Sequence, residues 1–167
     1  MRVLKRTLEV INDLVKDNII DDYAIGGSIA AVFYAKISNT DDLDIFIIPK
    51  MSNSIITYLG PLYEHLKGLG YEMDGQHVII EGTPVDFLPI YNPLTDEALQ
   101  NAPSKTYEGV QVKVFSPEYI VAISLQTGRS KDFARIDALM ELLDQDKLTE
   151  ILKRHGLYQK WVSHVSK

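Results

Sequence analysis

The chain has 167 residues, 46% of them hydrophobic and 24% charged, which suits a single soluble domain or a core with a modest extension. Its formal net charge of −6 argues against a protein that wraps duplex DNA, because such proteins carry a basic excess. The absence of cysteine excludes disulfides and thiolate chemistry and fits a cytoplasmic location, and the lack of a signal-peptide pattern or of about 20 consecutive apolar residues predicts no membrane partner.

The first part of the chain is expected to alternate helices and strands. Apolar residues at helical spacing predict an amphipathic first helix through Leu4, Leu8, Ile11 and Val15. Two apolar runs then predict strands, the second of which ends at Pro49. After the first helix we expect a strand over 23–26, a helix over 28–34, a strand over 43–48 and a helix over about 53–67, interrupted at Gly60-Pro61.

The middle of the chain carries turn signals between short apolar runs. Asp74-Gly75 and Glu81-Gly82 separate three such runs, which predicts three strands in meander order. Glu108-Gly109 marks a further hairpin. We expect strands around 71–73, 78–81, 85–90, 106–107 and 110–115, with a short helix over 95–100.

The last third of the chain is predicted to be helical. Ser116-Pro117-Glu118 is typical of a helix start, with a capping serine, an early proline and an acid near the positive end of the dipole. We expect helices over about 116–126, from residue 130 and over roughly 147–155, with Trp161 docking the tail. The predicted fold class is α+β: a mixed sheet of about five strands flanked by helices, with an α/β core over 1–115 and a C-terminal helical segment over 116–167 packed on that core.

The turn at Gly26-Gly27-Ser28 is the first candidate site. It lies where a strand is expected to pass into a helix, and glycines there let the backbone approach a ligand closely. Free N–H groups at a helix start favour an anion, and the Ser28 hydroxyl adds a donor. The alternative is a tight turn with a capping serine and no ligand.

A pair of acids at the start of the next strand is the second candidate. Asp42 and Asp44 leave the same face of a strand with Cα atoms roughly 6–7 Å apart, so both carboxylates can reach one hard cation. A polar loop cap would explain Asp41 and Asp42 without a metal. It explains Asp44 less well, because an ionised carboxylate among apolar neighbours needs a partner.

Asp86 is the third candidate, because it interrupts the apolar run of residues 84–89. If its strand lies beside strand 43–48, Asp86 joins Asp42 and Asp44 in one site. The alternative is an edge strand with Asp86 facing solvent, which the flanking prolines allow.

Two cations at a predicted helix start form the fourth candidate. Arg129 and Lys131 stand where acids are normally preferred, so a bound anion such as a nucleotide phosphate would favour them there. The alternative is a solvated loop in which Lys131 pairs with Asp132. The histidines show no metal-ligand spacing and are interpreted as surface or structural residues: His65, His77, His155 and His164.

In combination, Gly27-Ser28, Asp42-Leu43-Asp44 and Asp86 resemble the nucleotidyltransferase superfamily, whose members share the palm of DNA polymerase beta. That superfamily combines a Gly-Ser at a strand–helix turn, an Asp-x-Asp strand and a third acid on a neighbouring strand. The stretch 129–132 is similar to the Lys-Asp motif of a branch that includes the abortive-infection type nucleotidyltransferase toxins and uncharacterised relatives. The resemblance covers roughly residues 20–140 and implies the nucleotidyltransferase fold.

The resemblance implies an enzyme that transfers NMP from an NTP to an acceptor hydroxyl, with two Mg²⁺ ions and release of pyrophosphate. It assigns the metal to Asp42 and Asp44, with Asp86 in a metal or base role. The phosphate contacts that it implies fall on Gly26, Gly27, Ser28, Arg129 and Lys131. Position 135 departs from the pattern, because Arg135 stands where the family usually has an acid.

Two other classes stay open from the sequence. One is a nucleotide-binding or regulatory module without turnover, and the other is the toxin of a toxin–antitoxin pair, which would have an antitoxin partner. Three costly carboxylates favour the enzyme over the module. The acceptor classes are a tRNA end, a protein side chain or a small molecule such as an aminoglycoside, and the acidic charge argues mildly against a large RNA.

Overall fold

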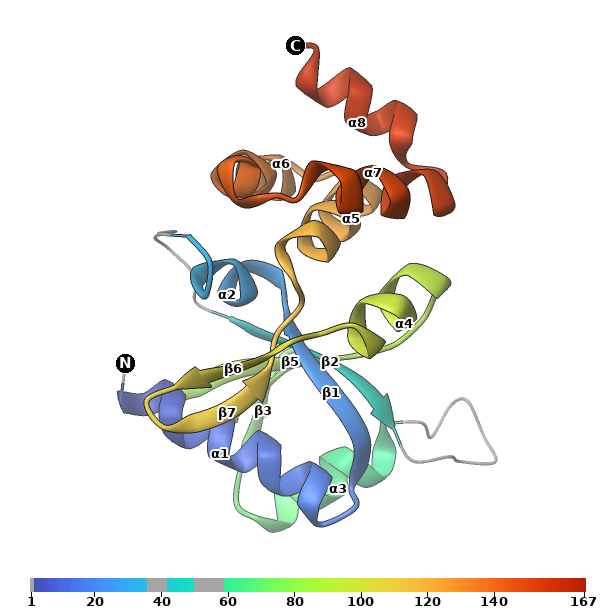
Figure 1. The fold of residues 1–167 in the computed structure, drawn as a ribbon. Helices are drawn as coiled ribbons and strands as arrows, with labels where there is room; N and C mark the ends of the chain where they lie inside the picture. The colour runs from blue at the N-terminus through green and yellow to red at the C-terminus, as the bar shows by residue number, and fades with distance from the viewer. Residues whose placement is uncertain (1, 36–41, 50–58) are drawn as a thin grey trace.

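The computed structural model describes residues 2–35, 42–49 and 59–167, and Figure 1 shows their arrangement. Among these residues no helix combines the length and the apolar character that crossing a bilayer requires. The elements in chain order are α1 (Arg2–Lys16), β1 (Ile20–Gly26), α2 (Gly27–Val32), β2 (Leu43–Pro49), α3 (Gly60–Gly68), β3 (Glu72–Asp74), β4 (His77–Ile80), β5 (Thr83–Pro89), α4 (Pro93–Gln100), β6 (Ser104–Tyr107), β7 (Val110–Lys113), α5 (Pro117–Thr127), α6 (Ser130–Leu139), η2 (Met140–Leu142), α7 (Gln145–Arg154) and α8 (Tyr158–Val165).

The main sheet has five strands in the order β1-β2-β5-β4-β3. Only the β2–β5 pair is parallel, while the other three pairs are antiparallel, so the sheet is mixed. The predicted α+β fold class is therefore confirmed. The strands β6 and β7 form a separate hairpin, which joins the main sheet through a parallel bridge between Ile25 and Val114.

The helices lie in two groups around the sheet. In Figure 1, α1 and α3 lie at one end of the molecule and α5 to α8 gather at the other. The helix α2 contacts β1 and β2 on one side and α5 and α6 on the other, so it connects the sheet to the C-terminal helices. Apolar side chains of the central strands are fully buried, among them Ile45, Ile47 and Val85.

Most predicted elements are present, and a few differ in their bounds or were not expected. The helix expected over 53–67 appears as α3 from Gly60, and residues 53–58 lie outside the described part of the chain. The strand β1 begins three residues earlier than expected and includes Asp22, whose carboxylate accepts a 2.7 Å hydrogen bond from Lys113. The helix α8 was not predicted; its one buried side chain, Trp161, is 7% exposed.

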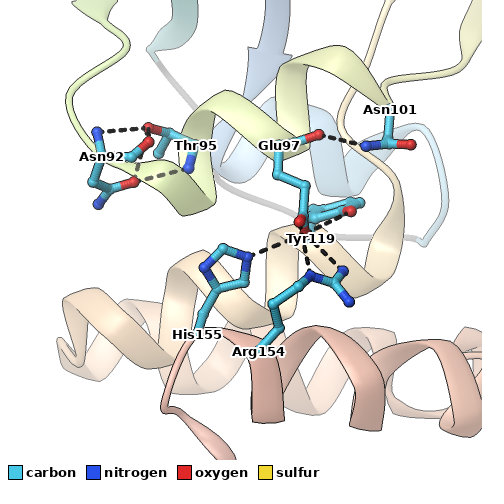
Figure 2. Close-up of polar contacts among 7 residues, drawn as sticks. All are labelled: Asn92, Thr95, Glu97, Asn101, Tyr119, Arg154 and His155. Carbon is cyan, nitrogen blue, oxygen red and sulfur yellow. Dashed lines mark hydrogen bonds and ion pairs between the residues drawn. The ribbon is translucent and has the colours of Figure 1, made fainter.

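A polar cluster around Glu97 ties α4 to the C-terminal helices (Figure 2). The Glu97 carboxylate accepts hydrogen bonds from Nε and Nη2 of Arg154 at 2.8 and 2.9 Å and from the Tyr119 hydroxyl at 2.9 Å. Nε2 of His155 lies 3.1 Å from the same carboxylate. Chiefly because of the Arg154 hydrogen bond, the pKa of Glu97 is lowered to about 2. One ionised carboxylate thus links α4, α5 and the end of α7.

This cluster predicts a pH-dependent contribution to stability. The pKa of Glu97 lies below its ordinary value, so its contribution is full above about pH 4.5 and is lost as the pH falls towards 2. We expect Glu97→Gln to lower the free energy of unfolding by about 2 kcal/mol at pH 7. Denaturant titrations between pH 7 and pH 2.5 should show the difference from wild type shrinking below about pH 4.5.

The exposed Glu150 of α7 provides a matched control. We expect Glu150→Gln to change the free energy of unfolding by less than about 0.5 kcal/mol at any of these pH values. A Glu97→Gln effect that stayed constant from pH 7 to pH 2.5 would show that the ionised carboxylate is not what stabilises this junction.

Candidate active site

The register of three neighbouring strands sets the predicted turn and two of the predicted acids side by side. In the antiparallel β1–β2 pair, Gly26 lies opposite Asp44. In the parallel β2–β5 pair, Asp44 lies opposite Asp86. The alternative of an edge strand for Asp86 is therefore wrong, since β5 lies between β2 and β4. These three positions are consecutive across the sheet at the end where β1 passes into α2.

A cavity of about 500 Å³ opens at this end of the sheet. Most of the predicted site residues line it: Gly27, Ser28, Asp42, Asp44, Asp86, Arg129 and Lys131. Gly26 does not line the cavity; it is buried, and a Cβ at its position would lie 2.4 Å from the Phe46 ring. The structure thus brings together the turn, the acids and the cations around one cavity. Gly26 instead packs against the rings of Phe46 and Phe115.

Gly27 is required at its position by both its conformation and its neighbour. Its φ is +61°, in the left-handed region that favours glycine, and an added Cβ would lie 2.2 Å from Oδ2 of Asp44. Ser28 is not the helix cap, because Gly26 holds that position and α2 has no side-chain cap. The Ser28 hydroxyl instead accepts a 2.8 Å hydrogen bond from Nη2 of Arg135.

The acids in the cavity repel one another. Burial raises the pKa of Asp44, and the negative charge on Asp86 raises it further, against the opposing charges of Arg135 and Lys131. Burial also raises the pKa of Asp86, and the charge on Asp42 adds to that effect. Both shifts mean that the folded protein disfavours this much negative charge at one place. A bound cation would relieve the repulsion.

The donor set fits a hard cation that shares substrate oxygens, and not a closed protein cage. Among the described residues, no group of three His, Asp or Glu side chains is arranged to hold a metal ion. Asp42 is the outlying acid, with a side chain that is 51% exposed. Asp44 and Asp86 are adjacent carboxylates, and Mg²⁺ commonly takes one or two carboxylates together with water and phosphate oxygens.

The β3–β4 hairpin contributes two cavity residues that sequence reasoning missed. Nε2 of His77 lies 3.5 Å from Oδ2 of Asp42, and Nε2 of Gln76 donates a 3.2 Å hydrogen bond to Oδ2 of Asp86. His77 had been interpreted as a surface or structural residue, because no second histidine stands at metal-ligand spacing. The turn signal at Asp74-Gly75 locates the hairpin, but nothing in the local sequence indicates that its end reaches the acids.

The cations at the start of α6 are divided between a structural contact and the cavity. Asp132 is fully buried. Its carboxylate accepts a 2.8 Å hydrogen bond from Nε of Arg129 and a 3.0 Å hydrogen bond from the backbone N–H of Arg129. Burial acts to raise the pKa of Asp132, but the contacts from Arg129 and the charge of Arg135 bring it below its ordinary value. The pairing of Lys131 with Asp132 considered above is therefore wrong. Lys131 is exposed on the cavity wall and forms no ion pair with a described residue.

Arg135 is a third cavity residue that sequence reasoning missed. Its Nη1 donates to Oδ1 of Asp132 at 3.0 Å and to Oγ of Ser124 at 3.3 Å, in addition to the Nη2 bond to Ser28. The side chain is 8% exposed and lines the cavity. Its one signal in the sequence is the departure at position 135 from the family's usual acid.

The fold that carries this site is the nucleotidyltransferase fold. The solution structure of the antibiotic-resistance factor ANT(2″)-Ia matches with a TM-score of 0.57 at 18% identity, over 99% of this chain and 98% of that one. The crystal structure of an antigenic nucleotidyltransferase-like protein from Paracoccidioides brasiliensis matches with a TM-score of 0.54 at 22% identity, over 97% and 91% of the two chains. ANT(2″)-Ia in complex with adenylyl-2″-tobramycin matches with a TM-score of 0.54 at 17% identity, over 92% and 98%.

The sequence itself gives the family. Residues 4–160 match the family described as "Nucleotidyl transferase of unknown function" (DUF2204), and the chain belongs to it. The protein is thus a nucleotidyltransferase, as the resemblance of its motifs implied. Among curated proteins none matches the chain.

Proposed function

We propose that the protein transfers NMP from an NTP to an acceptor hydroxyl, with Mg²⁺ as its cofactor and pyrophosphate as the leaving group. The observation that carries the proposal is the register of β2 and β5, which sets Asp44 directly beside Asp86. Two neighbouring, partly buried carboxylates are costly without a positive partner. A divalent cation that also binds phosphate oxygens meets that need.

Asp44 and Asp86 are proposed to hold the metal as the adjacent pair, with Asp42, the more exposed acid, as a third ligand. The resemblance implies two ions when an NTP is bound. When bound to these carboxylates, Mg²⁺ would neutralise part of the phosphate charge in the transition state. The other contributions come from side chains and backbone of the cavity.

In the transfer step, the acceptor oxygen forms a bond to the α-phosphorus, and the bond from that phosphorus to the bridging oxygen breaks. Pyrophosphate leaves with the electron pair. Asp86 is proposed to accept the hydroxyl proton, because its carboxylate lies beside Asp44 on the wall of the cavity. Gly27 and Ser28 are proposed to contact the triphosphate, and Lys131 to offset its charge.

The acceptor classes proposed are a small-molecule hydroxyl, an RNA end and a protein side chain. One solved structure of similar fold is a complex with adenylyl-2″-tobramycin, which supports the small-molecule class. We also propose that residues 1–115 form the catalytic core and that residues 116–167 close the site, in a cytoplasmic protein. The cavity lining supports this division, because Asp44 and Asp86 come from the first part and Lys131 and Arg135 from the second.

Lys131 provides a test of where the triphosphate binds. We expect Lys131→Ala to raise the KM for NTP about tenfold, because a charge-assisted contact to phosphate is lost, and to change kcat by less than about threefold. Steady-state pyrophosphate release at several NTP concentrations gives both constants. The exposed Lys160 of α8 is the matched control, and Lys160→Ala should leave both unchanged. Equal KM values for Lys131→Ala and Lys160→Ala would remove Lys131 from the triphosphate site.

A further inference from the structure

One buried guanidinium connects the turn after β1 to two C-terminal helices. Arg135 lies on α6, and its two terminal nitrogens reach Ser28 on α2, Ser124 on α5 and Asp132 on its own helix. The contact to Ser28 spans 107 positions of the sequence and is short, at 2.8 Å. Any movement of the Ser28 hydroxyl is therefore tied to the position of α6.

Stability alone does not account for this arginine. Burial lowers the pKa of Arg135, which indicates that its charge is costly in this environment. Asp132 already has a second cationic partner in Arg129. The Nε of Arg135 is buried and has no hydrogen-bond partner among the described residues. An apolar side chain of similar volume often serves stability as well as such a buried ion pair.

The donor-only chemistry of arginine decides how the Ser28 hydroxyl is used. A guanidinium has N–H donors and no acceptor, so Oγ of Ser28 must accept the bond from Arg135. A serine hydroxyl has one O–H donor besides its acceptor lone pairs. With one acceptor lone pair of Ser28 engaged by Arg135, the O–H remains available to donate to an anion in the cavity that both residues line.

We propose that Arg135 is a positioning residue that fixes the Ser28 hydroxyl as a donor to the triphosphate of the NTP. The inference rests on the proposed function and adds to it the residue that orients this phosphate contact. Arg135 acts through Ser28 and does not itself touch the nucleotide. Its effect should therefore vanish when the Ser28 hydroxyl is absent.

A double-mutant cycle on nucleotide affinity tests this dependence. Calorimetric titration with Mg²⁺ and each of ATP, CTP, GTP and UTP identifies the tightest ligand, which is then titrated into Ser28→Ala, Arg135→Met and the double variant. We expect Ser28→Ala and Arg135→Met each to weaken binding about tenfold, and the double variant to bind within about twofold of Arg135→Met. Losses that multiply to about 100-fold in the double variant would overturn the proposal.

The conservative variant distinguishes positioning from general damage. Arg135→Lys keeps a donor-only cation that can still donate to Ser28, although its single ammonium cannot serve all three partners of the guanidinium. We therefore expect its nucleotide affinity to stay within about threefold of wild type and to exceed that of Arg135→Met. The loss in Arg135→Met should appear in the KM for NTP, with kcat at saturating NTP within about threefold of wild type. A fall in kcat that parallels a fall in melting temperature would assign Arg135 a structural role only.

Two outcomes decide the matter even if Arg135→Met does not fold. If Ser28→Ala binds the nucleotide with an affinity within twofold of wild type, the inference is overturned directly. A tenfold loss of affinity in Ser28→Ala, together with an affinity near wild type in Arg135→Lys, supports it. If wild-type protein binds none of the four nucleotides with Mg²⁺, the proposed function fails together with the inference. If wild type binds and the losses multiply, only the assignment of Arg135 fails.

Discussion

Replacing Asp44 by asparagine is expected to lower metal-dependent pyrophosphate release by on the order of 10³-fold. Asparagine keeps the size of the side chain and removes the charge that holds the cation. The pKa of Asp44 is raised, first by burial and then by Asp86, so its ionised form is disfavoured in the folded protein. At pH 7 the variant should therefore be as stable as wild type or more stable.

The opposite directions of these two effects make the Asp44→Asn result specific. Initial rates of pyrophosphate release at saturating NTP and Mg²⁺, together with melting temperatures, measure both. Asp17→Asn, at an exposed position after α1, is the matched control and should change neither. Turnover of Asp44→Asn within tenfold of wild type would remove Asp44 from the reaction, and a large drop in melting temperature would make its role structural.

Gly27→Ala is expected to have the second-largest effect, because it would disturb the same carboxylate from the backbone side. The left-handed φ of +61° disfavours alanine, and the new Cβ would have to displace Oδ2 of Asp44 from a distance of 2.2 Å. Strain and displacement together should lower the free energy of unfolding by about 3 kcal/mol. Moving a catalytic group by about 1 Å should lower kcat/KM by about 100-fold.

Gly156 separates the two causes of the Gly27→Ala effect. Its φ is +69°, close to that of Gly27, but an added Cβ would meet nothing within 4 Å. We therefore expect Gly156→Ala to cost about 1 kcal/mol of unfolding free energy with no change in turnover. Chemical denaturation and kcat/KM on both variants make the comparison. Similar losses in the two variants would mean that contact with Asp44 contributes nothing at Gly27.

The sequence predicts those helices and strands whose residues carry a local pattern, such as an apolar run or a turn signal. The apolar run of 43–48 and the turn signals at Asp74-Gly75 and Glu81-Gly82 define β2 and the β3–β4–β5 meander. The apolar residues of α8 do follow helical spacing, at positions 158, 161, 162 and 165, but they cover only about two turns, which is too short for the period alone to predict a helix. The early start of β1 depends on its pairing with β2, in which Ile20 lies opposite Pro49, and no local pattern contains that register.

The site residues also divide into those that a local sequence pattern predicts and those that it does not. A carboxylate that interrupts an apolar strand is visible in the sequence because its burial would be costly, and this singled out Asp44 and Asp86. The roles of His77 and Arg135 depend on partners far along the chain, and neither residue type is unusual in its local context. Tertiary structure was therefore needed to find the groups that surround the acids.

The fate of labelled phosphorus tests nucleotidyl transfer most directly. Wild-type protein, Mg²⁺ and an NTP labelled at either the α- or the γ-phosphorus would be incubated with acceptor candidates from each class: aminoglycosides, tRNA and a protein extract. We predict that the α-label moves to an acceptor, that the γ-label leaves in pyrophosphate, and that Asp44→Asn slows both by on the order of 10³-fold. Transfer of the γ-label to an acceptor, or α-label transfer by Asp44→Asn at a rate within tenfold of wild type, would contradict nucleotidyl transfer at this site.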